Sequence, residues 1–383
     1  LTENIIHLVL ARTTDAPKGT KGISLFLVPK FEVNDDGSVG SRNGVSTNSI
    51  ESKMGIKGSP TCVLNFENSK GIMIGPENKG LSSMFTMMNL ERIVVGVQGL
   101  GIAETAYQNA VAYSKERKQG KANNSTNGET DLIIKHADIR RSLMNMKSII
   151  EGQRSFAFWL SQQIDVSLSH DDKDVRNHAS NMVALLTPVI KSFFTDNGVE
   201  ITNDAIQVFG GYGYTKDQGI EQLFRDNRIT PIYEGTNSVQ AIDLVYRKIS
   251  SEGVFENFIK SMDSEIKNYK DEKNLENFLN IFEKYKEILV SFTKWMRDKM
   301  NSNKDDASAA CNDYLKVLGY TALAFAWIKT LKVSFEKQSA NKDFYEDKIN
   351  TGKYYFEKIL PRAQSHYVVG TSGSHTTMNA KFN

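Results

Sequence analysis

The spacing of apolar residues changes once in the first part of this chain, near Gly80. Before that point, short apolar runs at 5–12 and 22–30 are separated by turn-forming residues, a pattern typical of β-strands. Beyond it, four apolar residues recur at the period of an amphipathic helix: Leu81, Met84, Phe85 and Met88. The sequence therefore predicts an α+β protein in which a partial antiparallel β-domain precedes an all-α region.

The helical pattern continues in three long segments, at about 80–117, 131–167 and 175–209, with polar links between them. Long amphipathic segments joined by short links are typical of a helix bundle. We therefore predict the C-terminal part of a β-domain at 1–78 and a helical-bundle domain at 79–251.

The composition changes after residue 252, where Lys, Glu and Asn alternate with apolar residues at helical spacing. Such charge runs are usually the solvated faces of helices. By contrast, residues 311–333 are apolar on nearly all sides, which predicts a buried helix. A last helix at 344–369 should be broken or kinked at Pro361. We expect 252–383 to form an additional C-terminal helical domain.

Composition excludes several classes of protein. A net charge of +2 argues against a nucleic-acid surface, and no apolar run approaches the roughly 18 residues that a membrane span needs. Cys62 and Cys311 lie far apart in the sequence, so we expect two reduced thiols. The six histidines show no metal-ligand spacing, and no metal site is predicted. A cytoplasmic protein is the simplest expectation, with a mitochondrial one as the alternative because the sequence does not begin with Met.

Two stretches carry candidate chemistry. In RDNRITPIYEGTNSVQ (225–240), Glu234 follows Pro231 and precedes Asn237 and Ser238, either of which is a candidate helix N-cap. A lone Glu at such a junction is usually an exposed or capping residue. Arg225 and Arg228 in the same region have an equally ordinary interpretation as ion-pair partners of Asp226 or Glu221.

The second stretch is QVFGGYGY (207–214), which has three glycines in four positions. Glycine permits the positive φ of a helix C-cap and a tight turn, and bare backbone also lets a pyrophosphate approach closely. Spacing alone does not separate these two interpretations.

Together, these stretches resemble the C-terminal signature of the flavin-dependent acyl-CoA dehydrogenases. KMGIKGSPTCVLNF (53–66) is similar to strands of that family's middle β-domain, and 80–121 is similar to its long first C-terminal helix. The MMNLER and ERKQGK variants most resemble the branch that includes 3-methylmercaptopropionyl-CoA dehydrogenase. The resemblance covers roughly residues 1–250. The family normally has a helical N-terminal domain before this point, so we expect an N-terminally truncated member or a fragment.

The resemblance implies a role for each matching residue. Glu234 would be the base that removes the α-proton of an acyl-CoA thioester, with Asn89, Arg92, Tyr233 and Gly235 near the substrate. Asn89 stands where the family usually has Asp, and the KQG after Arg117 lacks an aromatic that the family often carries. The expected FAD contacts, several of them to the FAD of a neighbouring subunit, are Arg117, His136, Gln207, Phe209, Gly210, Gly211, Thr236, Asn237 and Ser238.

The chemistry explains why such residues are needed. Removing an α-proton requires a nearby base and hydrogen-bond donors on the carbonyl oxygen where enolate charge develops. The resemblance implies that hydride then passes to FAD, that an electron-transfer flavoprotein accepts the electrons, and that the protein is a homodimer or homotetramer. Two alternatives remain open: an acyl-CoA oxidase, which uses oxygen, and a truncated non-catalytic helical assembly protein.

Overall fold

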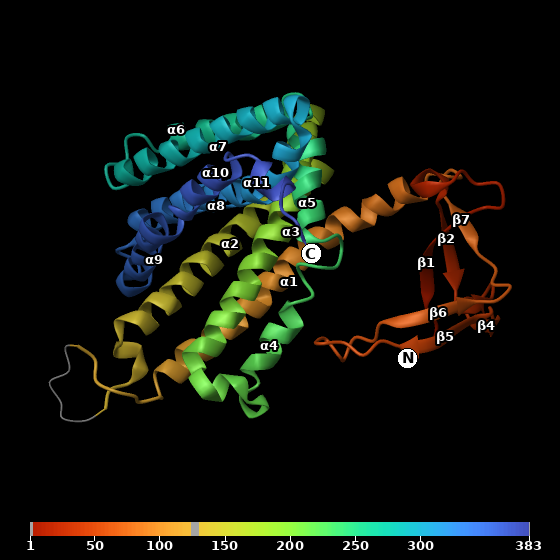
Figure 1. The fold of residues 1–383 in the computed structure, drawn as a ribbon, viewed down its shortest axis with the longest axis horizontal. Helices are drawn as coiled ribbons and strands as arrows, with labels where there is room; N and C mark the ends of the chain where they lie inside the picture. The colour runs from red at the N-terminus through yellow and green to blue at the C-terminus, as the bar shows by residue number, and fades with distance from the viewer. Residues whose placement is uncertain (1–2, 124–129, 383) are drawn as a thin grey trace. The chain divides into compact units, whose positions relative to one another are not determined.

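The computed structural model of the protein describes residues 3–123 and 130–382 and contains two compact units, Leu1–Glu91 and Arg92–Asn383 (Figure 1). Among the described residues, the named strands lie in the first unit, and the second unit is mainly helical. Helix α1, Gly80–Ser114, begins in the first unit and ends in the second. The predicted α+β class is confirmed.

The first unit contains three small antiparallel sheets, with strand orders β1-β2-β7, β3-β4 and β5-β6. Leu25 and Val28 on β2 are buried, and Leu10 of β1 pairs with Leu25. The Asn34–Ser38 turn joins β3 to β4 and contains Asn, Asp and Gly, residues that favour turns. The strands are β1 Ile6–Ala11, β2 Ser24–Pro29, β3 Phe31–Val33, β4 Val39–Arg42, β5 Val45–Ile50, β6 Cys62–Phe66 and β7 Ile72–Ile74.

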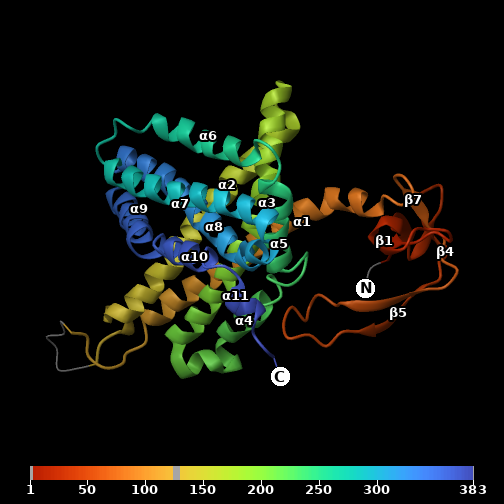
Figure 2. The same ribbon diagram turned by 45° about the horizontal axis from the view of Figure 1, so that its top comes forward.

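The second unit is a large helical assembly in which α2 and α3 run side by side, as do α7 and α8 (Figures 1 and 2). Its helices after α1 are α2 Ala137–Ser169, α3 Lys173–Phe209, α4 Ile220–Asn227, α5 Asn237–Asp243, α6 Val254–Lys267, α7 Glu276–Ser302, α8 Lys304–Lys337, α9 Lys342–Tyr354, α10 Arg362–Gly370 and α11 His375–Met378. Within the described residues, no helix is both long and apolar enough to cross a membrane.

Two predicted helix bounds were wrong by a few residues. Helix α1 ends at Ser114 rather than near Arg117, and α2 begins at Ala137 rather than 131. Part of the intervening chain instead forms a β-bridge between Lys118 and Leu132 and a 3-10 turn. The predicted interruption of the last helix at Pro361 is confirmed: the segment is divided into α9, a π-helical turn and α10, because Pro361 has no N–H to continue the helical ladder.

The helices on either side of residue 252 share one hydrophobic core. Trp327 of α8 is fully buried, and its Nε1–H donates to the carbonyl oxygen of Ser148 on α2 at 3.1 Å. An added Cβ on Gly152 of α2 would lie 2.7 Å from the same indole nitrogen, so α2 and α8 pack without space for a larger residue there. Cys311 is also buried, and both cysteines are free thiols, as predicted.

Small residues on α1 let it approach the backbone of α3. A Cβ added to Gly96 would lie 2.6 Å from the carbonyl oxygen of Ile190, and one added to Gly99 would lie 3.2 Å from the Cα of Thr195. Gly101 on the same helix is exposed and meets nothing within 4 Å. The α1–α3 contact therefore depends on glycine at 96 and 99 but not at 101.

We predict that Gly96→Ala lowers the free energy of unfolding by about 1 to 3 kcal/mol, because its methyl group must displace backbone. Gly101→Ala is the matched control and should raise the free energy by about 0.5 to 1 kcal/mol, since alanine favours the helix. Urea unfolding followed by circular dichroism measures both. Equal effects of the two substitutions would contradict this account of the contact.

Candidate active site

The turn between α4 and α5 holds Glu234 in an uncommon backbone conformation. Glu234 has a φ of 56° and Gly235 a φ of 86°, so two successive residues occupy the left-handed region. Glycine adopts this region freely, whereas a residue with a side chain does so at a cost of about 1 to 2 kcal/mol. The surrounding structure must hold Glu234 in place.

Donors from three helices supply that restraint through the turn's carbonyl groups. The oxygen of Glu234 accepts from Arg92 Nε at 3.3 Å and from Gln240 Nε2 at 3.0 Å. The oxygen of Gly235 accepts from Lys191 Nζ at 2.8 Å. Arg92, Lys191 and Gln240 are themselves buried, so the bonds are shielded from water. The Tyr233 hydroxyl, just before the turn, donates to Gln98 Oε1 of α1.

These restraints leave two groups of Glu234 available. Its side chain is half-buried, and among the described residues neither its carboxylate nor its backbone N–H has a hydrogen-bond partner. An acceptor and a backbone-fixed donor on one residue can act on two neighbouring atoms of a bound molecule. The alternative of a capping Glu is not what the structure shows, because Thr236 is the N-cap of the next helix; the role of Glu234 as a base stays a prediction.

The helix that follows is capped differently from the prediction. We expected Asn237 or Ser238 as the N-cap of α5, but Thr236 takes that position and its Oγ1 accepts from Val239 N–H at 3.4 Å. The Asn237 amide instead lies inward, where its Nδ2 donates to Asp196 Oδ1 at 2.6 Å and its Oδ1 accepts from Lys191 Nζ at 2.8 Å. The amide anchors the turn to α3.

Burial changes the titration of the charged groups beneath this turn. Loss of hydration lowers the pKa of Lys191 to about 8, and the Arg92 guanidinium lowers it in the same direction, whereas Asp196 and Glu234 oppose the shift. Burial also raises the pKa of Asp196, despite its hydrogen bond from Asn237. Opposite charges are thus packed together with little access to water.

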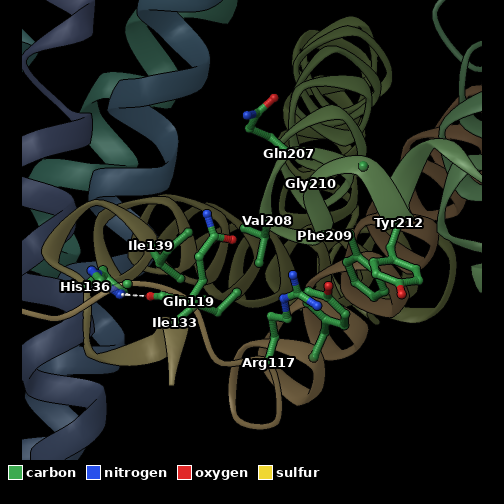
Figure 3. A pocket seen from close by; sticks show the side chains of 13 residues that line it. Arg117, Gln119, Ile133, His136, Ile139, Gln207, Val208, Phe209, Gly210 and Tyr212 are labelled. Atoms are coloured by element: carbon green, nitrogen blue, oxygen red, sulfur yellow. Dashed lines mark hydrogen bonds between the residues drawn. The ribbon is translucent and has the colours of Figure 1, made fainter. Parts of the chain in front are cut away.

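A separate pocket of about 430 Å³ lies where the end of α3 meets the segment between α1 and α2 (Figure 3). It brings together six residues that the family resemblance predicts as FAD contacts: Arg117, His136, Gln207, Phe209, Gly210 and Gly211. Thr236, Asn237 and Ser238 do not line it. Their predicted role as cofactor contacts stays a prediction.

The pocket combines a cation, aromatic rings and open backbone. The Arg117 guanidinium lies 5.7 Å from the Tyr212 ring centre, and the Tyr113 and Phe209 rings stack at 4.2 Å. Gly210 ends α3 with a φ of 61°, which confirms the predicted glycine C-cap, and a Cβ added there would meet nothing within 4 Å. His136 Nε2–H donates to the carbonyl oxygen of Gln119 at 2.8 Å, which fixes the imidazole at the edge of the pocket (Figure 3).

Two further residues that the sequence analysis singled out, Asn89 and Arg225, lie outside the Glu234 turn and the pocket. Asn89 is an exposed residue of α1 in the first unit. Arg225 pairs with Glu221 on α4, which confirms the expectation of an ordinary ion pair.

Sequence reasoning missed Lys191, Gln240 and Gln98, which hold the turn, and Tyr113, which lines the pocket. The available signal was the single Lys within the apolar run PVIKSFF of α3.

Two family models match the chain: "Acyl-CoA dehydrogenase, C-terminal domain" over residues 78–249 and "Acetyl-CoA dehydrogenase C-terminal like" over residues 258–381. The chain belongs to the acyl-CoA dehydrogenase family.

Among its relatives, 3-methylmercaptopropionyl-CoA dehydrogenase of Ruegeria pomeroyi is 42% identical over 253 residues, which is 66% of this chain and 43% of the relative. A butyryl-CoA dehydrogenase of Syntrophomonas wolfei is 33% identical over 376 residues, which is 94% of this chain and 62% of the relative. The chain thus spans about half the length of the relatives it matches.

Solved structures share the fold. An acyl-CoA dehydrogenase from Bacillus anthracis complexed with FAD aligns with a TM-score of 0.74 at 18% identity, covering 97% of this chain and 62% of that one. ACDH-11 from Caenorhabditis elegans, in complex with C11-CoA, gives a TM-score of 0.73 at 23% identity, covering 98% and 61%. These alignments cover nearly the whole chain, including the helices on either side of residue 252. The arrangement of α6–α11 is therefore a shared feature of the fold.

The turn provides a direct test of how tightly Glu234 is held. A Cβ on Gly235 would lie 2.7 Å from Gln240 Nε2, whereas one on Gly219, which also has a positive φ, meets nothing within 4 Å. Both alanine substitutions should lose about 1 kcal/mol to backbone strain. We predict that Gly235→Ala loses about 1 kcal/mol more, because it displaces the Gln240 amide from the Glu234 carbonyl. Urea unfolding measures the difference, and identical losses would contradict the prediction.

Proposed function

We propose that this protein catalyses the FAD-dependent α,β-dehydrogenation of an acyl-CoA thioester, which yields a 2-enoyl-CoA. The observation that carries the proposal is the Glu234 turn. Its carboxylate and its backbone N–H are both unbonded within the described residues, while its carbonyl is fixed by Arg92 and Gln240. Family membership supplies the class of reaction in which such a residue acts.

The two available groups of Glu234 match the two needs of the reaction. The carboxylate removes the proton from the α-carbon, and the N–H donates to the thioester oxygen as enolate charge develops there. The base and the donor belong to one residue whose backbone is restrained, which keeps them close to each other and to a bound thioester. Arg92 stabilises the turn through the Glu234 carbonyl rather than through the carboxylate.

The pocket at the end of α3 fits part of a flavin dinucleotide. The Arg117 guanidinium suits a diphosphate because it offers paired donors, and Gly210 and Gly211 leave backbone open to the same group. Tyr212 and Phe209 add apolar ring surface. When bound, FAD supplies the hydride acceptor for the β-carbon. We propose that the FAD held here belongs to a neighbouring subunit, which makes the active protein a homodimer or homotetramer.

Relatives guide the choice of substrate and acceptor. Their names specify 3-methylmercaptopropionyl-CoA and butyryl-CoA, two short acyl thioesters, so we propose a short acyl-CoA, with 3-methylmercaptopropionyl-CoA as the first candidate. We further propose that an electron-transfer flavoprotein accepts the electrons and that the protein works in the cytoplasm.

We predict that Glu234→Gln abolishes flavin reduction by the substrate without loss of FAD. The amide has nearly the same shape but does not remove a proton at neutral pH. The measurement is anaerobic titration of the full-length protein with a panel of acyl-CoAs, followed by the bleaching of flavin absorbance.

Glu252→Gln is the matched control, because Glu252 is exposed and far from the turn in sequence. It should bleach like the wild type. If Glu234→Gln also bleached at the wild-type rate, Glu234 would not be the base.

A separate prediction concerns the pocket. Arg117→Ala should weaken FAD retention by about 10- to 100-fold, since a charged hydrogen bond to phosphate is worth about 1.5 to 3 kcal/mol. Lys115→Ala is the control. It removes an equal charge two residues from Arg117, and because the Lys115 side chain does not line the pocket, this variant should retain FAD. Flavin content after dialysis measures both. If the two variants lost FAD equally, the effect of Arg117 would come from its positive charge in general and not from a contact with FAD.

A further inference from the structure

Lys191 is an unusual residue for the middle of a buried helix. Its side chain is 0% exposed, and Ile190, Phe193 and Phe194 beside it on α3 are also buried. Lysine is rarely buried completely, since its ammonium loses hydration that only well-placed partners replace. A residue needed only for packing at this position would be apolar. The cost of burying an amine therefore calls for a specific use.

Within the described part of the chain, the Lys191 amine bonds to the Glu234 turn and to the first residue of α5. Its Nζ donates to Gly235 O and to Asn237 Oδ1, each at 2.8 Å. Asn237 in turn donates through Nδ2 to Asp196 Oδ1 at 2.6 Å and to Thr195 Oγ1 at 3.0 Å. The amine thus joins α3 to the residue before Thr236 and to the residue after it.

The position of Lys191 in α3 is itself fixed. The close contact of Gly96 with Ile190, the residue next to Lys191, leaves the helix backbone little room to move toward α1. Thr195 Oγ1 donates to the Lys191 carbonyl at 2.7 Å, one turn further along the helix. A displacement of the turn would therefore have to break bonds to a fixed amine.

We propose that Lys191 is a positioning residue for catalysis, which holds the Gly235 carbonyl and the Asn237 amide so that Glu234 keeps its left-handed conformation. This inference rests on the proposed function of Glu234. Arg92 and Gln240 hold the carbonyl of Glu234, and Lys191 holds the carbonyl of the next residue, Gly235. Without the amine, the second carbonyl can rotate, and the carboxylate and N–H of Glu234 lose their fixed relation to a substrate.

The test uses the full-length, FAD-loaded protein and the substitution Lys191→Met, which preserves length and removes the donors. We expect the rate of flavin reduction by butyryl-CoA or 3-methylmercaptopropionyl-CoA to fall about 10- to 100-fold, since small misplacements of a base have effects of that size. FAD content and the half-saturating acyl-CoA concentration should change less than threefold. If Lys191 served folding alone, the substitution would not lower the rate of flavin reduction while leaving the FAD content and the half-saturating acyl-CoA concentration nearly unchanged.

Lys286 provides a matched control, because it is another buried lysine whose amine pairs with Asp263 and Glu283 on α6 and α7. Lys286→Met should lower stability and leave the reduction rate unchanged. Asn237→Ala is a second route to the same defect, because it removes one partner of the amine without altering Lys191. It keeps the proposal testable if Lys191→Met does not fold.

Amide hydrogen exchange of residues 229–240 provides a measurement that needs no activity. We expect exchange in this segment to accelerate at least tenfold in Lys191→Met and in Asn237→Ala but not in Lys286→Met. Wild-type exchange and wild-type reduction rates in both site variants would overturn the positioning role. If the wild-type protein is reduced by no acyl-CoA while the exchange pattern holds, the proposed function fails and the role of Lys191 in holding the turn stands.

Discussion

The site depends on hydrogen bonds to two successive backbone carbonyls, those of Glu234 and Gly235. Arg92 from α1, Lys191 from α3 and Gln240 from α5 reach these oxygens from buried positions. The bonds offset the cost of a left-handed Glu and leave its own functional groups unbonded within the described residues. The protein thus uses buried polar side chains to place one acidic residue, and the apolar core of the second unit places those side chains.

The same logic explains why α1 and α3 approach so closely. Gly96 and Gly99 remove side-chain volume from the contact, so the α3 backbone around Lys191 is fixed against α1, the helix that also carries Arg92 and Gln98. The donors that hold the turn therefore sit on two helices with a defined spacing. The second centre, around Arg117 and Gly210, is fixed by a different feature, the glycine end of α3. One long helix, α3, contributes to both centres.

Much of this arrangement follows from the sequence, for identifiable reasons. The change of period near Gly80 predicts strands before helices, and the glycines at 210 and 211 predict the end of α3, because local pattern and backbone freedom decide both. The pocket residues from 117 to 211 were grouped through the family resemblance. The α5 cap was predicted wrongly because Asn237 has partners on α3 that are distant in sequence. Lys191 was missed for the same reason: a single Lys in an apolar run marks an unusual position, but its role depends on the tertiary partners Gly235 and Asn237.

The shared core between α2 and α8 has a consequence for how such proteins diversify. Trp327 occupies space that exists only because residue 152 is glycine, and its indole N–H depends on a carbonyl of α2. The C-terminal helices α6–α11 therefore cannot be exchanged between family members without regard to α2. A chimaera that took α6–α11 from another member would need a compatible α2 surface from the same donor. Sequence changes at positions 152 and 327 should accordingly be inherited together rather than separately.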